Sequence, residues 1–464
     1  MAPGLFQKLL DLGNLESSIH PTAKDWERVN LSYQSLMRLL EQDDIMIYGI
    51  HTGYGANVLS NRDPAKWKKN QIELLEYLQV GVGAALPARV VRRALRLQIL
   101  KSLQGHSGLH PETLLQLVHL SNSPKLPQVP RYGSLGASGD LIPMAHATGP
   151  VFMNGGPLGP RDVIGLVNTN SMMSSYAIEL LSDTHRILDL AHEITSLVMF
   201  SVKASLEPLS EDVCGLRSPE DGYRRSALVL KSILDKNNMN SLEASERSWL
   251  QARYSIRCAP MVFGNCLDQL NFAEAKIIAD AESVADNPVI FSEDGNDRVL
   301  HAGLFYAAST ATAADCMLDV IGKASEILDR QILILMDPNL NENLPENLFV
   351  AQMGHCKGLH QLISAMNQQL RSHSTPSRLM SFSCEGNNQD VVPCAMSALN
   401  QLQSAVDIGK EIVRASLFVA LRAAALRRGS LVPSALNLNC WAEFKNEEKL
   451  SILEKIDNTS GKHR

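Results

Sequence analysis

The chain has 464 residues, of which 45% are hydrophobic, 20% are charged and only 5% are aromatic. This is the composition of an ordinary globular protein, which excludes a disordered chain, and its many Leu and Ala residues favour helices. The formal net charge of -6 supplies no basic field for nucleic acid or an anionic membrane. No apolar run reaches the roughly 18 residues that a membrane span needs. We therefore expect neither nucleic acid nor membrane as a partner.

The N-terminal segment, MAPGLFQKLLDLGNLESS, lacks the long apolar core and cleavage site of a signal peptide. The eight cysteines lie far apart without a CxxC pair, so neither a zinc knuckle nor a disulfide framework is expected. No histidine cluster has metal-ligand spacing, and no metal is implied. A reducing, cytoplasmic location is the expectation.

Helical periodicity dominates the rest of the chain. The basic run RVVRRALRLQILK, residues 89–101, has helical spacing, and we interpret it as a solvated helix face or a subunit contact. Apolar residues recur with a period near 3.6 at Ile178, Leu181 and Leu188, and again over residues 359–370. Strand-like alternation is scarce. The pattern predicts a mainly α fold with long helices.

The predicted organisation has three consecutive parts: a loop-rich N-terminal part over residues 1–190, a helix bundle over 191–425 and a helical tail over 426–464. Gly and Pro residues concentrate in a few loops, where chemistry is most often found. These loops cover residues 48–55, 124–143, 151–160 and 336–345.

One of these loops leads into the sequence RYGSLGASGDLIPMAH, residues 131–146, which packs small residues around Ser138. Asp140 and Pro143 are typical of a helix start. Spacing alone leaves two interpretations open. The segment is either a Gly-rich turn before a helix, where an anion could bind at the helix start, or a turn with another function. Neither a phosphate-loop nor a dinucleotide-binding fingerprint fits the segment.

The run GSLGASGDLIPMAH resembles the signature of the histidine, phenylalanine and tyrosine ammonia-lyases, in their compact bacterial form. The resemblance implies that Ala137, Ser138 and Gly139 cyclise to 4-methylidene-imidazol-5-one, abbreviated MIO. The Gly139 nitrogen would attack the Ala137 carbonyl, an approach that a residue without Cβ allows, and Ser138 would lose its hydroxyl to leave an electrophilic methylene. A cofactor is needed because no natural side chain is electrophilic enough to activate an amine as a leaving group.

Further segments resemble the same family in the same order over most of the chain. They are YGIHTGYG from Tyr48, VNTN from Val167, QARYSIRC from Gln251, SVADNPVIF and HAGLF ending at Phe305, MDPNLNENLPENL, and EGNNQDVV from Glu385. The resemblance implies an elongated, mainly α homotetramer built on a long-helix bundle of the fumarase and aspartase type. It also implies that each active site is built from three subunits.

By resemblance, Tyr48 is the catalytic base on a mobile lid; alternatively it is a lid tyrosine that only packs. As a base it must lose a proton near neutral pH although its ordinary pKa is about 10, which requires a positive potential from helix N-termini. Tyr254 and Arg257 are near neighbours on a helix. The resemblance implies a catalytic position for Tyr254 and substrate-carboxylate binding for Arg257, whose planar fork suits that task; a structural ion pair is the alternative for Arg257.

Three amides, Asn168, Gln251 and Gln389, would orient the substrate and the prosthetic ring by resemblance, with Asn168 against the ring. Satisfied core amides are the alternative. Glu385 would lie near the substrate amine, or it forms a solvated pair with Gln389. Phe305 would form a wall of the substrate pocket, or it belongs to the core.

The family reads the substrate side chain with two consecutive residues ahead of a Gly-x-Gly turn, here Tyr77 and Leu78 before Gly81-Val82-Gly83. Histidine-specific members have Ser-His at this place, tyrosine-specific members His-Leu and phenylalanine-specific members Phe-Leu. A ring followed by Leu makes an apolar pocket, and the Tyr77 hydroxyl could pair with a phenol. Residues 388–390 read NQD where histidine-specific members have the pattern QEDH, which also points away from histidine as the substrate.

We therefore expect an ammonia-lyase that converts phenylalanine or tyrosine, rather than histidine, to an α,β-unsaturated acid. The alternatives are an aminomutase of the same family that makes a β-amino acid, a lyase for another amino acid and a catalytically dead helical scaffold. The intact triplet argues against the dead scaffold. Departures from the family pattern at His51, Thr169 and Ala252-Arg253 indicate an unusual substrate or a biosynthetic role.

Overall fold

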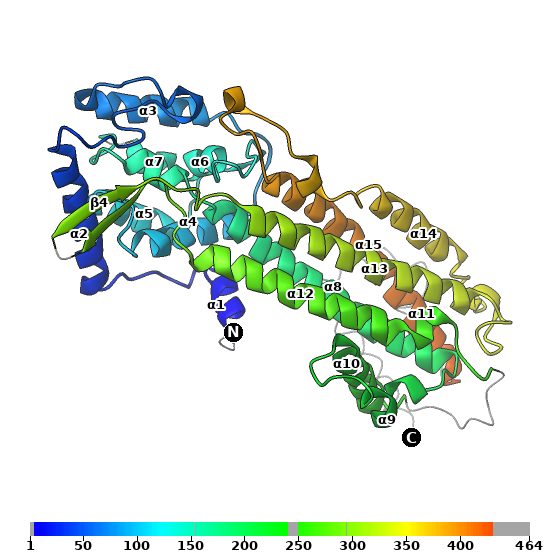
Figure 1. Cartoon of the computed structure of the whole chain (residues 1–464). Coiled ribbons are helices and arrows are strands. Elements are labelled where there is room, and N and C mark those ends of the chain that lie inside the picture. The colour runs from blue at the N-terminus through cyan, green and yellow to red at the C-terminus, as the bar shows by residue number, and fades with distance from the viewer. Residues whose placement is uncertain (1–3, 154, 240–248, 294, 430–464) are drawn as a thin grey trace. The chain divides into compact units, whose positions relative to one another are not determined.

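The computed structural model describes residues 4–153, 155–239, 249–293 and 295–429 (Figure 1). The chain forms two compact units from interleaved segments. Residues 1–181, 272–315 and 376–402 form the first unit, and residues 182–271, 316–375 and 403–464 form the second. These units do not coincide with the predicted parts 1–190 and 191–425, because long helices carry the chain from one unit into the other. The predicted tail, 426–464, lies outside the described residues from residue 430 onward.

The prediction of a mainly α fold with long helices is confirmed. The periodic positions Ile178, Leu181 and Leu188 are buried on one long helix, and residues 359–370 lie in α14 (Lys357–Arg371). The longest helices have residues in both units. They are α8 (Ser171–Ser201), α12 (Ala259–Glu282), α13 (Ala308–Met336) and α15 (Ala395–Arg427).

The first unit combines short helices with two small antiparallel sheets. Strand β1 (Val82–Ala85) pairs with β2 (Pro130–Tyr132), and β3 (Val289–Glu293) pairs with β4 (Asn296–Leu300). Its other elements are α1 (Leu5–Asp11), α2 (Ala23–Leu40), α3 (Trp67–Leu78), α4 (Ala88–Ser102), α5 (Pro111–Asn122), α6 (Leu141–Phe152), α7 (Asp162–Val167) and the 3-10 helices η1 (Gly55–Asn57), η2 (Pro64–Lys66), η6 (Ser377–Met380) and η7 (Glu385–Asn387).

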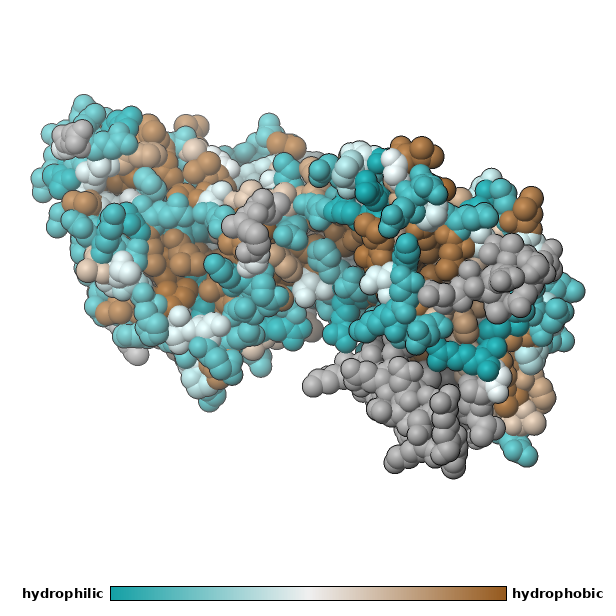
Figure 2. Space-filling model, turned by 90° about the horizontal axis from the view of Figure 1, so that it is seen from below, coloured by the Kyte–Doolittle hydropathy of each residue, from teal (hydrophilic) through white to brown (hydrophobic). Residues whose placement is uncertain are grey.

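The second unit adds shorter helices to its parts of the long ones. They are η3 (Glu207–Leu209), α9 (Glu211–Cys214), α10 (Gly222–Lys236), α11 (Tyr254–Arg257), η5 (Glu346–Leu348) and α14. Large apolar side chains remain exposed on both units, among them Leu59 and Leu250, and Figure 2 shows apolar areas at the surface between polar ones. No helix in the described part of the chain is both long and apolar enough to cross a membrane.

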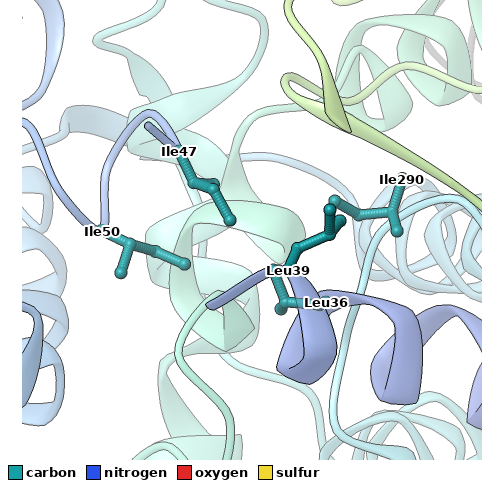
Figure 3. Close-up of a cluster of buried hydrophobic side chains, with 5 residues drawn as sticks. All are labelled: Leu36, Leu39, Ile47, Ile50 and Ile290. Carbon is teal, nitrogen blue, oxygen red and sulfur yellow. The ribbon is translucent and has the colours of Figure 1, made fainter. Parts of the chain in front are cut away.

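A small apolar cluster fixes the start of the loop that carries Tyr48. Ile47 and Ile50, on either side of Tyr48, are fully buried against α2 and β3. Figure 3 shows these two side chains together with Leu36, Leu39 and Ile290. Each buried aliphatic side chain contributes about 1.5–3 kcal/mol. The backbone at Tyr48 is therefore held by its neighbours even where the following loop is not.

The basic run 89–101 does form a helix, α4, but the prediction of a solvated face was wrong. Several of its cations are buried instead of facing solvent. Arg93 donates to the carbonyls of Leu10 and Ser175, each at 3.0 Å, and Arg96 donates to two carbonyls of the segment that follows α1. The guanidinium groups are retained inside because they satisfy backbone acceptors that would otherwise be buried without a donor.

Candidate active site

The predicted triplet lies in a tight turn between β2 and α6. Gly136 and Gly139 have φ values of +77° and +71°, a region that glycine enters without strain. A Cβ on Gly139 would lie only 2.2 Å from the carbonyl oxygen of Thr169. The Ser134 hydroxyl closes the turn, because it accepts from the Gly136 amide at 3.1 Å and donates to the Gly139 carbonyl at 3.2 Å. The fold therefore leaves room only for glycine at position 139.

Asp140 ends the turn, and α6 begins at the next residue as predicted. Its carboxylate, however, makes no capping hydrogen bond to its own helix. Oδ2 accepts instead from the Met172 and Met173 amides, at 2.7 and 3.0 Å, in the first turn of α8. Helix α8 begins in the interior, where its first N–H groups need an acceptor and favour negative charge. Complete burial raises the pKa of Asp140 to about 7, against the lowering effect of these hydrogen bonds.

Two of the predicted polar residues contact Ser138, and a third, Glu385, contacts one of them. The Asn168 side chain donates from Nδ2 to the Ser138 carbonyl at 2.8 Å. The Gln389 amide donates to the Ser138 hydroxyl at 2.6 Å and to Glu385 Oε2 at 3.0 Å. Ala137, the first residue of the triplet, is buried beside Val392 and Cys394. The turn thus has a polar side, where two side-chain amides donate to Ser138, and an apolar side at Ala137.

The Tyr48 loop closes over the same place. The Tyr48 hydroxyl accepts from the Gly55 amide at 2.7 Å, and the Ala56 amide donates to Glu385 Oε1 at 3.4 Å. Glu385 therefore contacts both the loop and Gln389. It is not on a helical face with Gln389; instead the two residues are joined by the short turn of η7, with Cys384 and Gln389 in a β-bridge.

Burial raises the pKa of Tyr48, and the negative charge of Glu385 adds to the rise, whereas the Gly55 N–H and Arg161 lower it. The net direction is opposite to the one that a base at neutral pH needs. The Gly55 N–H that lowers this pKa is the first N–H of the 3-10 helix η1.

The predicted specificity pair lies at the C-terminal end of α3. Leu78 is buried, whereas Tyr77 is 52% exposed. Burial of the phenol raises the pKa of Tyr77 to about 12, and the charges of Tyr48 and Glu385 add to this rise. Tyr77 thus lies within the electrostatic influence of Tyr48 and Glu385, and its hydroxyl stays protonated.

Phe305 is half-buried in the loop after β4. Two residues later, the Ala307 amide donates to the Gly136 carbonyl at 3.3 Å, which ties this loop to the triplet turn. Earlier in the loop, His301 Nε2 accepts from the Tyr48 amide at 3.3 Å. Sequence reasoning did not single out His301, although it stands in the HAGLF segment. The loop from His301 to Ala307 therefore connects the lid to the triplet turn.

Gln251, Tyr254 and Arg257 lie in the second unit, apart from the other predicted residues, which all belong to the first. Arg257 stacks on Tyr254, with the guanidinium carbon 4.8 Å from the ring centroid, and donates to the Ala252 carbonyl at 3.3 Å. Gln251 and Arg257 line a cavity of about 490 Å³. Tyr254 is 72% exposed. In the single chain, these three residues form a group in which Tyr254 faces solvent.

The departures from the family pattern have local structural roles. His51 Nδ1 accepts from the Ile47 amide at 3.0 Å. The Thr169 hydroxyl pairs with that of Ser171 at 2.9 Å, at the start of α8. In the described ranges, no cluster of three or more His, Cys, Asp or Glu side chains could hold a metal ion.

The chain also matches known proteins in sequence and in fold. Residues 7–156 and 153–446 match the model of the family described as aromatic amino acid lyase. A histidine ammonia-lyase of Bradyrhizobium diazoefficiens is 28% identical over 429 residues, which cover 87% of this chain and 81% of the relative. One of Burkholderia cenocepacia is 31% identical over 411 residues, 82% of this chain and 79% of the relative.

A solved structure of the Pantoea agglomerans phenylalanine aminomutase superposes with a TM-score of 0.84 at 20% identity, and the match covers 98% of this chain and 96% of the other. The fold is therefore that of the ammonia-lyases and aminomutases. The chain belongs to the aromatic amino acid lyase family.

Proposed function

We propose that the protein is a MIO-dependent ammonia-lyase that acts on an aromatic L-amino acid, with phenylalanine or tyrosine as the substrate. The observation that carries the proposal is the turn at Gly139. Gly139 has a positive φ and no room for a Cβ, so the turn is compressed and confined to glycine, which favours the close approach of its nitrogen to the carbonyl two residues earlier. The residues present therefore fit the formation of the prosthetic group from this triplet.

Formation of the group balances without an oxidant. A bond forms between the Gly139 nitrogen and the Ala137 carbonyl carbon, and the carbonyl oxygen leaves as water with the amide hydrogens of Gly139 and Ser138, as a C=N bond forms to the Ser138 nitrogen. Ser138 then loses its hydroxyl and its α hydrogen as a second water. Asn168 and Gln389 hold the serine by its carbonyl and its hydroxyl during these steps. Once formed, the group supplies the electrophile that turns the substrate amine into a leaving group.

The remaining residues act on the substrate. Tyr48 Oη removes a β proton, and its loop excludes water when it is closed on Glu385. Glu385 lies where it can hold the departing ammonia, because its carboxylate reaches both the lid and Gln389. Tyr77 and Leu78 present a ring and an aliphatic side chain to the substrate, with Phe305 as a further wall.

The second group of residues completes the site from a neighbouring subunit. Arg257 binds the substrate carboxylate, with Gln251 and the exposed Tyr254 beside it. A homotetramer in the cytoplasm is part of the proposal. Exposed apolar side chains on the single chain support it, because contiguous apolar surface of this kind usually marks an interface (Figure 2).

Histidine is the second candidate substrate, because curated relatives at 28% and 31% identity are named histidine ammonia-lyases. The physical case against it rests on the Tyr77-Leu78 pair, since neither side chain carries a charge that would favour an imidazolium. The Tyr77 hydroxyl stays protonated and is a donor for a phenol oxygen or an imidazole nitrogen. Product identity separates the two candidates.

The experiment is mass spectrometry of products after separate incubation with L-phenylalanine, L-tyrosine and L-histidine. We expect cinnamate or coumarate as the product of the wild-type enzyme. In Ser138→Ala, we expect that turnover is abolished and that the triplet peptide no longer shows the mass loss of two waters. Ser123→Ala, directly after α5, is the matched control and should behave as wild type. Urocanate as the main product would replace the substrate assignment, and a β-amino acid would make the enzyme an aminomutase. Turnover by Ser138→Ala would refute the mechanism.

A further inference from the structure

A buried lysine lies behind the triplet turn. Lys101, in the last turn of α4, is 3% exposed. Its ammonium donates to Asn170 Oδ1 and, at 2.8 Å, to the backbone carbonyl of Asp280 in α12. The Asp280 carboxylate is itself engaged, because it accepts from the Thr310 hydroxyl at 2.8 Å. The ammonium thus joins the start of α8 to α12 across the interior of the first unit.

Burial of an ammonium group is costly unless it is paired and hydrogen-bonded. Burial lowers the pKa of Lys101 to about 8, and the charges of Asp280 and Asp140 oppose this effect. The proposed reaction does not use Lys101. A purely apolar residue at this place would avoid the desolvation cost but would leave Asn170 and the Asp280 carbonyl without this donor.

The loop that Lys101 contacts is the one that shapes the triplet. Asn168 holds the Ser138 carbonyl. The Thr169 carbonyl accepts from the Asp140 amide at 2.6 Å and is the atom that excludes a Cβ at Gly139. Asn170 is the next residue and accepts from Lys101. Consecutive residues therefore contact the serine, the glycine end of the triplet and the buried ammonium.

We propose that Lys101 is a positioning residue for cyclisation of the triplet, an inference that rests on the proposed function. By anchoring Asn170 to α12, the ammonium fixes Asn168 and the Thr169 carbonyl, and these in turn hold the triplet in the compressed turn from which the Gly139 nitrogen reaches Ala137. Such preorganisation lowers the entropic cost of ring closure. Lys101 touches none of the reacting atoms and acts only through the loop.

The test compares Lys101→Met with the matched control Arg96→Met on the same helix. Arg96 is also a buried cation bonded to backbone carbonyls, but it contacts the segment after α1 and not the Asn170 loop. The readouts are the fraction of the triplet peptide that has lost two waters, followed over time by mass spectrometry, and the thermal unfolding of each variant. We expect Lys101→Met to mature at least about tenfold more slowly, as the loss of a charged hydrogen bond predicts, and Arg96→Met to mature as wild type even where it is less stable.

Two further variants keep the inference falsifiable if Lys101→Met does not fold. Asn170→Ala removes the acceptor and leaves the lysine, and it should slow maturation in the same way. Lys101→Gln keeps a donor without charge and should restore part of the rate. Maturation at the wild-type rate in a folded Lys101→Met or Asn170→Ala would overturn this inference alone. A wild-type protein whose triplet never loses water would overturn the proposed function together with it.

Discussion

Gly139→Ala is the substitution whose cost follows most directly from the structure. An alanine at φ +71° carries about 1–2 kcal/mol of backbone strain. Its Cβ would also lie 2.2 Å from the Thr169 oxygen, so that the Thr169 carbonyl must move by about 1 Å to restore van der Waals contact. That movement breaks its bond to the Asp140 amide, at about 0.5–1.5 kcal/mol. We expect a total loss of about 1.5–3.5 kcal/mol.

Gly295→Ala is the matched control. Gly295 has φ +79° in the turn between β3 and β4, and nothing lies within 4 Å of its added Cβ. It should therefore show the backbone strain alone. The assay is urea unfolding of both variants, with the mass of the triplet peptide measured in parallel. If Gly139→Ala were no less stable than Gly295→Ala within about 0.5 kcal/mol, and its triplet still lost two waters, the close approach at Thr169 would not shape the turn.

The remaining predictions concern the lid, the amine site and the core. Tyr48→Phe should lower kcat by about 10²–10⁴-fold, while the triplet matures normally. Because burial raises the pKa of Tyr48, the kcat/KM of the wild-type enzyme should rise with pH through the alkaline range. A pH-independent profile would argue against Tyr48 as the base. Gln389→Glu removes the donor to the Ser138 hydroxyl and places a second carboxylate beside Glu385, so activity should fall by at least about tenfold; wild-type activity in steady-state assays would refute the role of this contact. Asp286→Ala leaves Arg161 buried without its partner at 2.9 Å, and chemical denaturation should show a loss of about 3–5 kcal/mol; a loss below about 1 kcal/mol would mean that water or another acceptor compensates.

Several features of the fold and the site were readable from the sequence because their signals are local. The period of 3.6 residues predicts α8 and α14, since a helix buries one face regardless of what covers it. The small residues around Ser138 predict a tight turn, because only they tolerate the backbone conformations found at Gly136 and Gly139. The start of α6 was predicted from Asp140 and Pro143, which are also local signals.

Other features depend on partners far along the chain and have no local signature. A helix with cations at 3.6-residue spacing looks the same whether it faces water or backbone carbonyls, which is why the burial of α4 was missed. Asp140 looks like a cap for α6, yet its carboxylate caps α8, which begins more than thirty residues later. Lys101 and Asn170 are likewise distant in sequence, and neither belongs to a pattern that would pair them.

The electrostatics of Tyr48 indicate what a single chain lacks. Within the first unit, burial and Glu385 both disfavour the phenolate, and the Gly55 N–H and Arg161 are the groups that favour it. Arg161 is itself committed to Asp286 at 2.9 Å, which weakens its field at the lid. In its proposed role as a base, Tyr48 would need additional positive potential, which a neighbouring subunit of the proposed homotetramer would supply. Arg257, which stacks on Tyr254 and has no carboxylate partner among the described contacts, is the cation best suited to be shared with a neighbouring subunit. The same assembly that would bring a carboxylate-binding arginine to the triplet would thus also correct the pKa of its base.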